Sequence, residues 1–193
     1  MKGIIIMIRK LLVVFVALLV IASMSTSFAQ FNEEGPSKFG VKLMNFIPMD
    51  SFLKNLNSIW IGPALDWNLK YDEDEKLLSY LTLCIMSSGD GSNKASVTFV
   101  SYTKLNRTPI SDTRSRYTGV GIGLYDLKYQ GIAYNSNTLD YEDYSVQSYK
   151  PGIHLLYGQE FKDTYFAEIE VNLMQGWEGV NWGGVFLNIG IKL

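Results

Sequence analysis

The sequence has only one cysteine, Cys84, and one histidine, His154, among its 193 residues. A single cysteine excludes a disulfide within the chain, and therefore excludes a small secreted domain held together by disulfides. One histidine and one cysteine do not supply the nitrogen and sulfur ligands of a typical metal site. The glycine-rich motif "GVGIG" at 119–123 lies inside a predicted strand with no helix after it, so it does not match a phosphate-binding loop. We expect neither a metal nor another cofactor.

Clusters of lysine and arginine are also lacking. The chain has 17 basic and 19 acidic residues and a formal net charge of −2. A protein that binds nucleic acid needs a basic face to meet the phosphates. The charge pattern therefore predicts no nucleic-acid partner.

The one long apolar run is the 12-residue segment "LLVVFVALLVIA" at 11–22. Two basic residues stand directly before it, and the small residues Ser27 and Ala29 follow at the spacing that signal peptidase reads. The run is short for a transmembrane helix, and the pattern is that of a secretory signal peptide. We predict a signal peptide over 1–29 and a single mature domain over 30–193; the alternative is an N-terminal anchor that is not cleaved.

Helical periodicity is absent from the mature sequence, and alternation with a period of two replaces it. In "TYFAEIEVNLM", for example, the apolar residues fall on one face and the glutamates on the other. The pattern predicts an all-β fold with eight strands, at 38–47, 58–71, 76–88, 94–105, 116–130, 147–161, 163–174 and 183–193.

The predicted connections alternate in length. Those after the second and sixth strands are tight, and those after the first, third, fifth and seventh are long. Short turns at one end and long loops at the other are typical of an outer-membrane barrel, whose strands of 9–11 residues cross the bilayer. The segment "NRTPISDTRSR" at 106–116 departs from the rule, because it predicts a long loop at the short-turn end.

The chain ends on the alternating stretch "VFLNIGIKL" at 185–193. An edge strand of a soluble sheet usually carries charge or proline, whereas a closed barrel leaves no edge because its last strand pairs with its first. We predict that the apolar residues of this strand face lipid and that Phe186, Asn188 and Lys192 face inward. The sequence thus predicts an eight-stranded, antiparallel, up-and-down transmembrane β-barrel.

Aromatic residues gather near the predicted strand ends, where the rings of outer-membrane barrels form girdles at the membrane interface. The residues are Trp60, Tyr71, Tyr102, Tyr117, Tyr129, Tyr149, Phe161, Tyr165, Trp177 and Trp182.

The last 75 residues or so resemble the small eight-stranded outer-membrane barrels of the OmpW and opacity-protein type. The resemblance is carried by "YTGVGIGLYDLKY" at 117–129, "KPGIHLLYGQEF" at 150–161 and "TYFAEIEVNLM" at 164–174. It implies that His154 packs inward and that the strand after it carries inward glutamates. The last strand also resembles the assembly signal of bacterial outer-membrane proteins, although this chain has Leu193 where those proteins usually have Phe or Trp.

Polar residues on the inward face form a candidate network. An eight-stranded barrel is just wide enough inside for side chains, so charges there need partners. Such a network either plugs the barrel or lines a narrow path or ligand cavity. Its predicted core is Lys42, Asp66, Lys70, His154, Glu160, Glu168, Glu170 and Lys192, with Asn68, Asp126 and Lys128 also expected to face inward.

His154 raises the alternative of an enzyme. An outer-membrane lipid hydrolase would need a nucleophile, usually serine, beside the histidine and a carboxylate to orient it. Ser148 is too far along the same strand to serve. We therefore expect no catalysis, unless another strand brings a serine to this histidine.

Two long connections are candidate surface elements. The segment "MDSFLKNLN" predicts one short helical turn with Phe52, Leu53 and Leu56 on its apolar face. The predicted loop at 131–146 mixes tyrosines and acids, a composition that suits adhesion or recognition as well as plain solvated loop.

Together these patterns predict a monomeric integral protein of the bacterial outer membrane. Its expected role is structural, surface interaction, or passage of a small hydrophobic solute, as is suggested for OmpW-like barrels. Its expected partners are outer-membrane lipid, the assembly machinery, and a small hydrophobic solute or surface ligand. The alternative from another class is a soluble periplasmic barrel of the lipocalin type, whose apolar face would point inward to a ligand.

Overall fold

The computed structural model describes residues 39–72, 77–89, 93–135, 140–162, 164–174, 176 and 179–193. The predicted signal peptide at 1–29 and the start of the mature domain at residue 30 lie outside these described residues. Within them, no helix is both long enough and apolar enough to cross a membrane.

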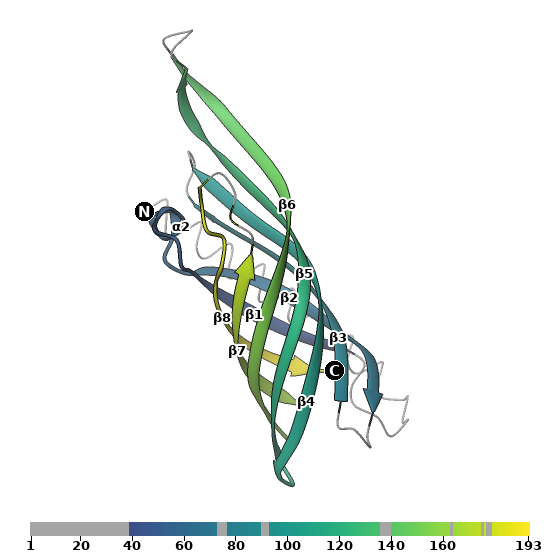
Figure 1. The fold of residues 1–193 in the computed structure, drawn as a ribbon. Helices are drawn as coiled ribbons and strands as arrows, with labels where there is room; N and C mark the ends of the chain where they lie inside the picture. Colours follow the sequence, from purple (N-terminus) through teal and green to yellow (C-terminus); the bar gives the residue numbers. More distant parts are fainter. Residues whose placement is uncertain are drawn as a thin grey trace, which may run out of the picture. The chain divides into compact units, whose positions relative to one another are not determined.

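Eight strands form one closed antiparallel barrel in the order of the sequence, with β8 paired to β1 (Figure 1). This arrangement confirms the predicted fold class. The strands are β1 Phe39–Pro48, β2 Trp60–Asp72, β3 Leu77–Gly89, β4 Lys94–Ser111, β5 Arg114–Asn135, β6 Asp140–Phe161, β7 Tyr165–Met174 and β8 Gly184–Lys192.

The two faces of each strand have opposite character, as the alternation predicts. On β8, Phe186 and Asn188 are buried inside, while Leu187 and Ile189 are 41% and 59% exposed on the outside. Because the period of a strand is two, one residue of slip would exchange these faces. The C-terminal strand therefore takes the orientation predicted for it.

The β4–β5 connection differs from the prediction. Residues 106–116 are not a long loop, because β4 runs to Ser111 and β5 starts at Arg114, which leaves Asp112 and Thr113 as a two-residue turn. Thr108 and Pro109 continue the ladder opposite Arg116 and Ser115. With this correction, the connections that the structure describes at the end of the barrel holding the β4–β5 turn are all short.

The predicted loop at 131–146 is wrong in the same way. β5 extends to Asn135 and β6 begins at Asp140, so most of this segment pairs as two strands. Isoleucine, valine and tyrosine favour strands in this segment. The alternation of apolar and polar residues is weak, and among the described side chains residues 141–145 are exposed on both faces of β6.

The two ends of the barrel are named here by what they carry. The terminal end holds the start of β1 and the end of β8, where Gly40 faces Lys192. The loop end holds the short helix α2, Ser51–Leu56, whose N-cap Asp50 accepts a hydrogen bond from the backbone of Phe52. This helix confirms the predicted helical turn, and its Leu53 is fully buried against the barrel core.

The rim of the loop end is uneven. β7 pairs with β6 only as far as Gly152, whereas β5 and β6 stay paired out to Asn135 and Asp140. Figure 1 shows these two strands reaching well past their neighbours. β6 therefore has a long stretch, Asp140–Pro151, that is paired with β5 on one side and with no described strand on the other.

The predicted aromatic girdle is partly correct. Tyr102, Tyr149 and Tyr165 are 40–64% exposed on the outer face. Trp60, Tyr117 and Trp182 are buried instead, because they fall on the inward face. The side chains of Tyr71 and Trp177 lie outside the described residues, Tyr129 and Phe161 are half-buried, and Phe39, Trp67 and Tyr157 join the exposed set.

Candidate functional site

Lys42 is the centre of the buried polar network. Its Nζ lies 3.1 Å from Oδ2 of Asp66 on β2 and 3.3 Å from Oε2 of Glu168 on β7. All three side chains are nearly inaccessible to solvent. Burial of an unpaired charge is costly, so the two carboxylates and the ammonium hold three strands of the barrel together.

Neutral groups complete the bonds of these carboxylates. The Thr82 hydroxyl donates to Oδ1 of Asp66 at 2.6 Å, and the Tyr117 hydroxyl donates to Oε1 of Glu168 at 2.9 Å. The Asn188 amide donates to the other oxygen of Glu168 at 3.3 Å. Glu168 thus receives three hydrogen bonds, from residues on β1, β5 and β8.

A second group surrounds His154. Its Nε2 lies 2.8 Å from the Thr103 hydroxyl on β4, and its Nδ1 lies 3.9 Å from Oε1 of Glu170 on β7. The second distance is too long for a hydrogen bond. Gly121, which pairs with His154 across the ladder, has no room for a Cβ because the imidazole ring fills that space.

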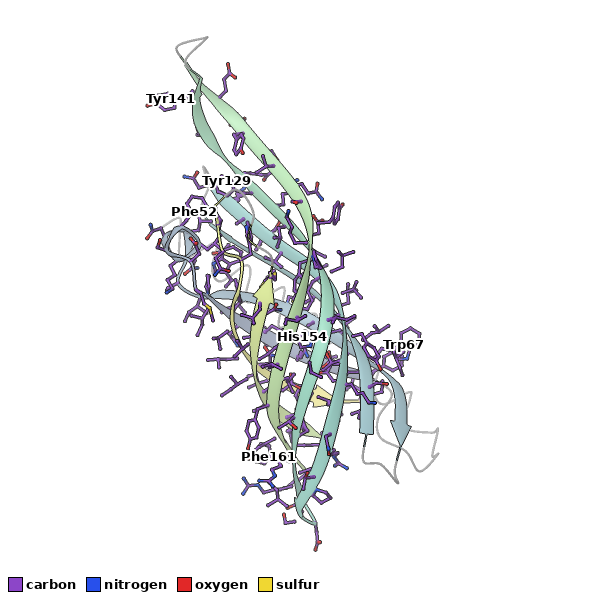
Figure 2. The ribbon with its side chains drawn as sticks, viewed as in Figure 1. Phe52, Trp67, Tyr129, Tyr141, His154 and Phe161 are labelled. Carbon is purple, nitrogen blue, oxygen red and sulfur yellow. The ribbon has the colours of Figure 1, made fainter. Side chains whose placement is uncertain are left out.

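Hydroxyl, imidazole and carboxylate stand here in the order of a catalytic triad, with threonine where the sequence analysis looked for serine. However, Thr103 and His154 are each 1% exposed and Glu170 is 3% exposed. A lipid ester has no access to a hydroxyl enclosed in this way. Figure 2 shows His154 in the body of the barrel, and its contacts are those of interior packing.

A third group closes the terminal end. The carboxylate of Glu160 on β6 accepts a hydrogen bond from Lys192 Nζ at 2.7 Å and another from Arg107 at 3.1 Å. Glu160 is 3% exposed, while the two basic side chains are partly exposed. This group therefore forms the boundary between the interior and solvent.

A small cavity separates the first group from the third. It measures about 30 Å³ and is lined by residues of both groups, including Asp66, Tyr117, Glu160 and Glu168. A volume of this size holds about two water molecules. It is too small for a hydrophobic solute.

Aromatic side chains fill the barrel toward the loop end. The ring centroid of Phe46 lies 5.7 Å from that of Trp60 and 4.7 Å from that of Phe186. The ring centroids of Trp60 and Trp182 lie 6.3 Å apart. Leu53 of α2 packs into the same cluster. The loop end is thus plugged by apolar groups. The middle and terminal end are filled by the polar groups together with a second buried cluster, Leu78, Tyr80, Leu105, Tyr117 and Leu156.

The predicted site residues are distributed as follows. The structure places seven of the eight core residues on the inward face, and it does not describe the side chain of Lys70, whose backbone lies on β2 opposite Ser79. Asn68 lines the cavity. Asp126 and Lys128 were expected inside and lie on the outer face, because their neighbours Tyr125 and Leu127 are fully buried.

Sequence reasoning missed Thr103 and Arg107. Thr103 lies on the inward face of β4 with Val97 and Phe99. Apolar and polar residues alternate only weakly on this strand, so the sequence did not show which of its residues face inward. Arg107 was placed in a loop. Within the described residues, no three histidine, cysteine, aspartate or glutamate side chains are grouped so as to hold a metal ion.

We expect Glu168→Ala to lower the free energy of unfolding by about 2–3 kcal/mol, because a charged hydrogen-bond acceptor is lost from the buried Lys42. Urea titration of the protein in lipid vesicles would measure this change in the free energy of unfolding. Asp143→Ala, an exposed carboxylate on β6, is the control and should change stability by less than about 0.5 kcal/mol. Equal stability of the Glu168 variant and the wild type would show that this carboxylate does not hold the interior.

Comparison with known proteins gives structural neighbours only. No protein-family model matches the chain, and no curated protein matches it in sequence. Among solved structures, the chain is similar to Neisserial surface protein A, with a TM-score of 0.58 and 13% identity over 83% of this chain and 100% of that one. It is also similar to Ail, the attachment invasion locus protein of Yersinia pestis, with a TM-score of 0.52 and 14% identity over the same shares. At this identity the likeness shows the fold, which is that of the small eight-stranded barrels of the outer-membrane type.

Proposed function

We propose that this protein is an integral, monomeric outer-membrane barrel with a sealed interior, which presents the β5–β6 hairpin at the cell surface. The observation that carries the proposal is a belt of exposed apolar side chains on β2 to β8. The belt consists of Ile61, Leu65, Trp67, Leu69, Leu83, Ile85, Val100, Tyr102, Val120, Ile122, Leu124, Ile153, Leu155, Tyr157, Ile169, Leu173, Leu187 and Ile189.

The height of the belt is somewhat below, but close to, the roughly 25 Å apolar band of outer-membrane barrels. On β6 it lies between the exposed rings of Tyr149 and Tyr157. These rings are eight residues apart, or roughly 26 Å along the strand, which a tilt of about 40° reduces to roughly 20 Å across the membrane. This value is near the apolar band of known outer-membrane barrels.

A soluble barrel of the lipocalin type would have the opposite arrangement. Its apolar residues would face a ligand cavity and its charges would face water. Here the charges of Lys42, Asp66 and Glu168 are inside, and isoleucine and leucine are outside. The apolar belt supports the bilayer and gives no support to the soluble alternative.

Orientation follows from the connections. In bacterial barrels the turns on the periplasmic side are short and the loops outside the cell are longer. We therefore place the terminal end in the periplasm and the loop end, with α2 and the β5–β6 hairpin, outside the cell. The signal peptide at 1–29 would deliver the chain to the periplasm, and the assembly machinery would insert it.

A structural and surface-interaction role is favoured over solute passage or catalysis. The interior is filled by the polar groups and the aromatic cluster, and the cavity between the polar groups holds only about two waters. His154 and Thr103 are enclosed. Within the class of small outer-membrane barrels, we further propose that this chain is related to the OmpW-like and opacity-like proteins, on the basis of the motifs at 117–129 and 150–161.

One neighbour suggests a contrast in surface chemistry. A structure of Ail in complex with the heparin analogue sucrose octasulfate has a TM-score of 0.50 and 15% identity to this chain. In the present chain the segment 129–146 has three acidic residues and no lysine or arginine. The β5–β6 hairpin is therefore expected to repel such an anion.

Cell fractionation tests the proposed function. We expect the full chain to be recovered in the outer membrane, to migrate differently on gels with and without boiling, and to give no steady conductance in planar bilayers. Recovery as a soluble periplasmic protein, without a mobility shift, would overturn the membrane proposal. A steady ion current would overturn the sealed interior.

A further inference from the structure

The uneven rim leaves part of β6 without a described neighbouring strand on one side. On β6, residues Asp140–Pro151 pair with β5 but with no described strand on the opposite side, because β7 pairs only with Gly152–Phe161. This open stretch, called here the β6 edge, is roughly 40 Å long at about 3.3 Å per residue. Such an edge presents a row of backbone N–H and C=O groups to a further strand.

The outer part of the hairpin, residues 129–135 and 140–146, is called the ribbon, and residues 141–145 in it are exposed on both faces. Ile132 is 48% exposed, Tyr141 is 71% exposed and Tyr144 is 41% exposed. Figure 2 shows Tyr141 near the far end of the ribbon, away from the barrel. A two-stranded ribbon exposed on both faces is only marginally stable in water, and a third strand would stabilise it.

The base of the ribbon is anchored. The ring of Tyr129 lies 5.2 Å from that of Phe52 on α2 and 6.4 Å from that of Tyr144, and its hydroxyl donates to Asn93 at 2.9 Å. The part of the β6 edge near the barrel is therefore held in a fixed direction. A preorganised edge binds a partner with less loss of conformational entropy.

The charge of the ribbon selects the partner. The segment 129–146 carries three acidic residues, Asp140, Glu142 and Asp143, and four tyrosines, with no basic residue. Carboxylates attract lysine and arginine, and tyrosine rings bind cations over their faces. A second copy of this chain is disfavoured, because two such ribbons side by side would place like charges together.

We propose that the β6 edge binds an extended, lysine- or arginine-rich peptide segment of another protein, which adds to the sheet as a further strand. Backbone hydrogen bonds along the edge supply affinity, and the acidic and aromatic side chains supply the preference for positive charge. This proposal deepens the proposed surface-interaction role and rests on it, since the ribbon must face the outside of the cell.

The probe is a fluorescein-labelled 12-residue peptide of alternating lysine and threonine. Fluorescence anisotropy would measure its binding to the full-length protein in detergent micelles. A second peptide, N-methylated at every backbone nitrogen, keeps the side chains and charges but has no backbone N–H to donate. We expect binding by the first peptide, at least tenfold weaker binding by the second, and weaker binding as salt is added.

The protein variant is the double substitution Glu142→Lys, Asp143→Lys, and its control is Asp112→Lys at the opposite end of the barrel. We expect at least tenfold weaker binding for the double variant and a change of less than about twofold for the control. Absence of binding up to about 1 mM peptide would overturn the proposal. Equal binding of the two peptides would also overturn the proposal, because charge attraction alone would then explain the affinity. An equal loss of binding in the Asp112→Lys control would overturn it for the same reason.

The failure of this proposal is separate from failure of the proposed function. A protein that fractionates with the outer membrane and shows the mobility shift, yet binds no peptide, keeps its proposed membrane role and loses only the edge partner. A protein recovered from the periplasm that still binds the peptide has the open edge but not the location.

Discussion

Lys42→Met is expected to lower the free energy of unfolding by about 3–5 kcal/mol, the range for breaking a buried ion pair by removal of one partner. Methionine has a similar length but no charge. Asp66 and Glu168 would then be left in the interior without the ammonium that lies 3.1 and 3.3 Å from them. Urea titration in lipid vesicles, followed by gel mobility without boiling, would give the change.

The control for this variant is Lys54→Met on α2, where the side chain is exposed. It should change stability by less than about 0.5 kcal/mol. A triple variant, Lys42→Met with Asp66→Asn and Glu168→Gln, should recover much of the loss, because a neutral interior has no unpaired charge. If Lys42→Met and Lys54→Met were equally stable, the buried network would not hold the barrel together.

Ile122→Arg is expected to cost about 2–4 kcal/mol, the value for an arginine on the lipid face at the middle of a barrel's apolar band. Ile122 is 64% exposed and pairs with Ile153, which lies midway between the exposed rings of Tyr149 and Tyr157. In water, an exposed isoleucine would tolerate this change. The same unfolding assay in lipid vesicles measures it.

Ile132→Arg is the matched control, because Ile132 lies on the same face of the same strand, out on the ribbon, and is 48% exposed. It should change the free energy of unfolding by less than about 0.5 kcal/mol. A cost of similar size for both variants, or for neither, would contradict the assignment of a bilayer to the belt. This test examines the outside of the barrel and the Lys42 test examines the inside, so the two results are independent.

Much of the fold was predictable because the alternation of apolar and polar residues fixes which face of a strand is buried. β7 and β8 have strict alternation, and their bounds and faces differ little from the prediction. The prediction failed at the outer parts of β4, β5 and β6. There most of the described side chains are exposed on both faces, so burial imposes little pattern. Turn-like residues such as those at 106–116 also resemble a loop.

The site was predictable as a set of inward polar residues but not as a set of partners. Lys42 lies 126 positions before Glu168 in the chain, and only the closure of β8 onto β1 brings the two strands within reach of each other. Thr103 could not be paired with His154 without the register of β4, β5 and β6. The prediction was wrong at Asp126 and Lys128, because their charge was taken to mark the inward face. The apolar residues beside them, Tyr125 and Leu127, are the ones that are buried.

The sequence by itself predicted an eight-stranded barrel whose strands have one apolar and one polar face, because alternation with a period of two separates the two kinds of residue. It favoured the apolar face outside and left open a soluble barrel with that face inside. The tertiary structure alone decided which charge meets which, which side chains surround His154, and that β6 runs past β7 with no described strand on that side. These features depend on register and on the lengths of neighbouring strands. Both are set by pairings between residues far apart in the chain, which no local pattern encodes.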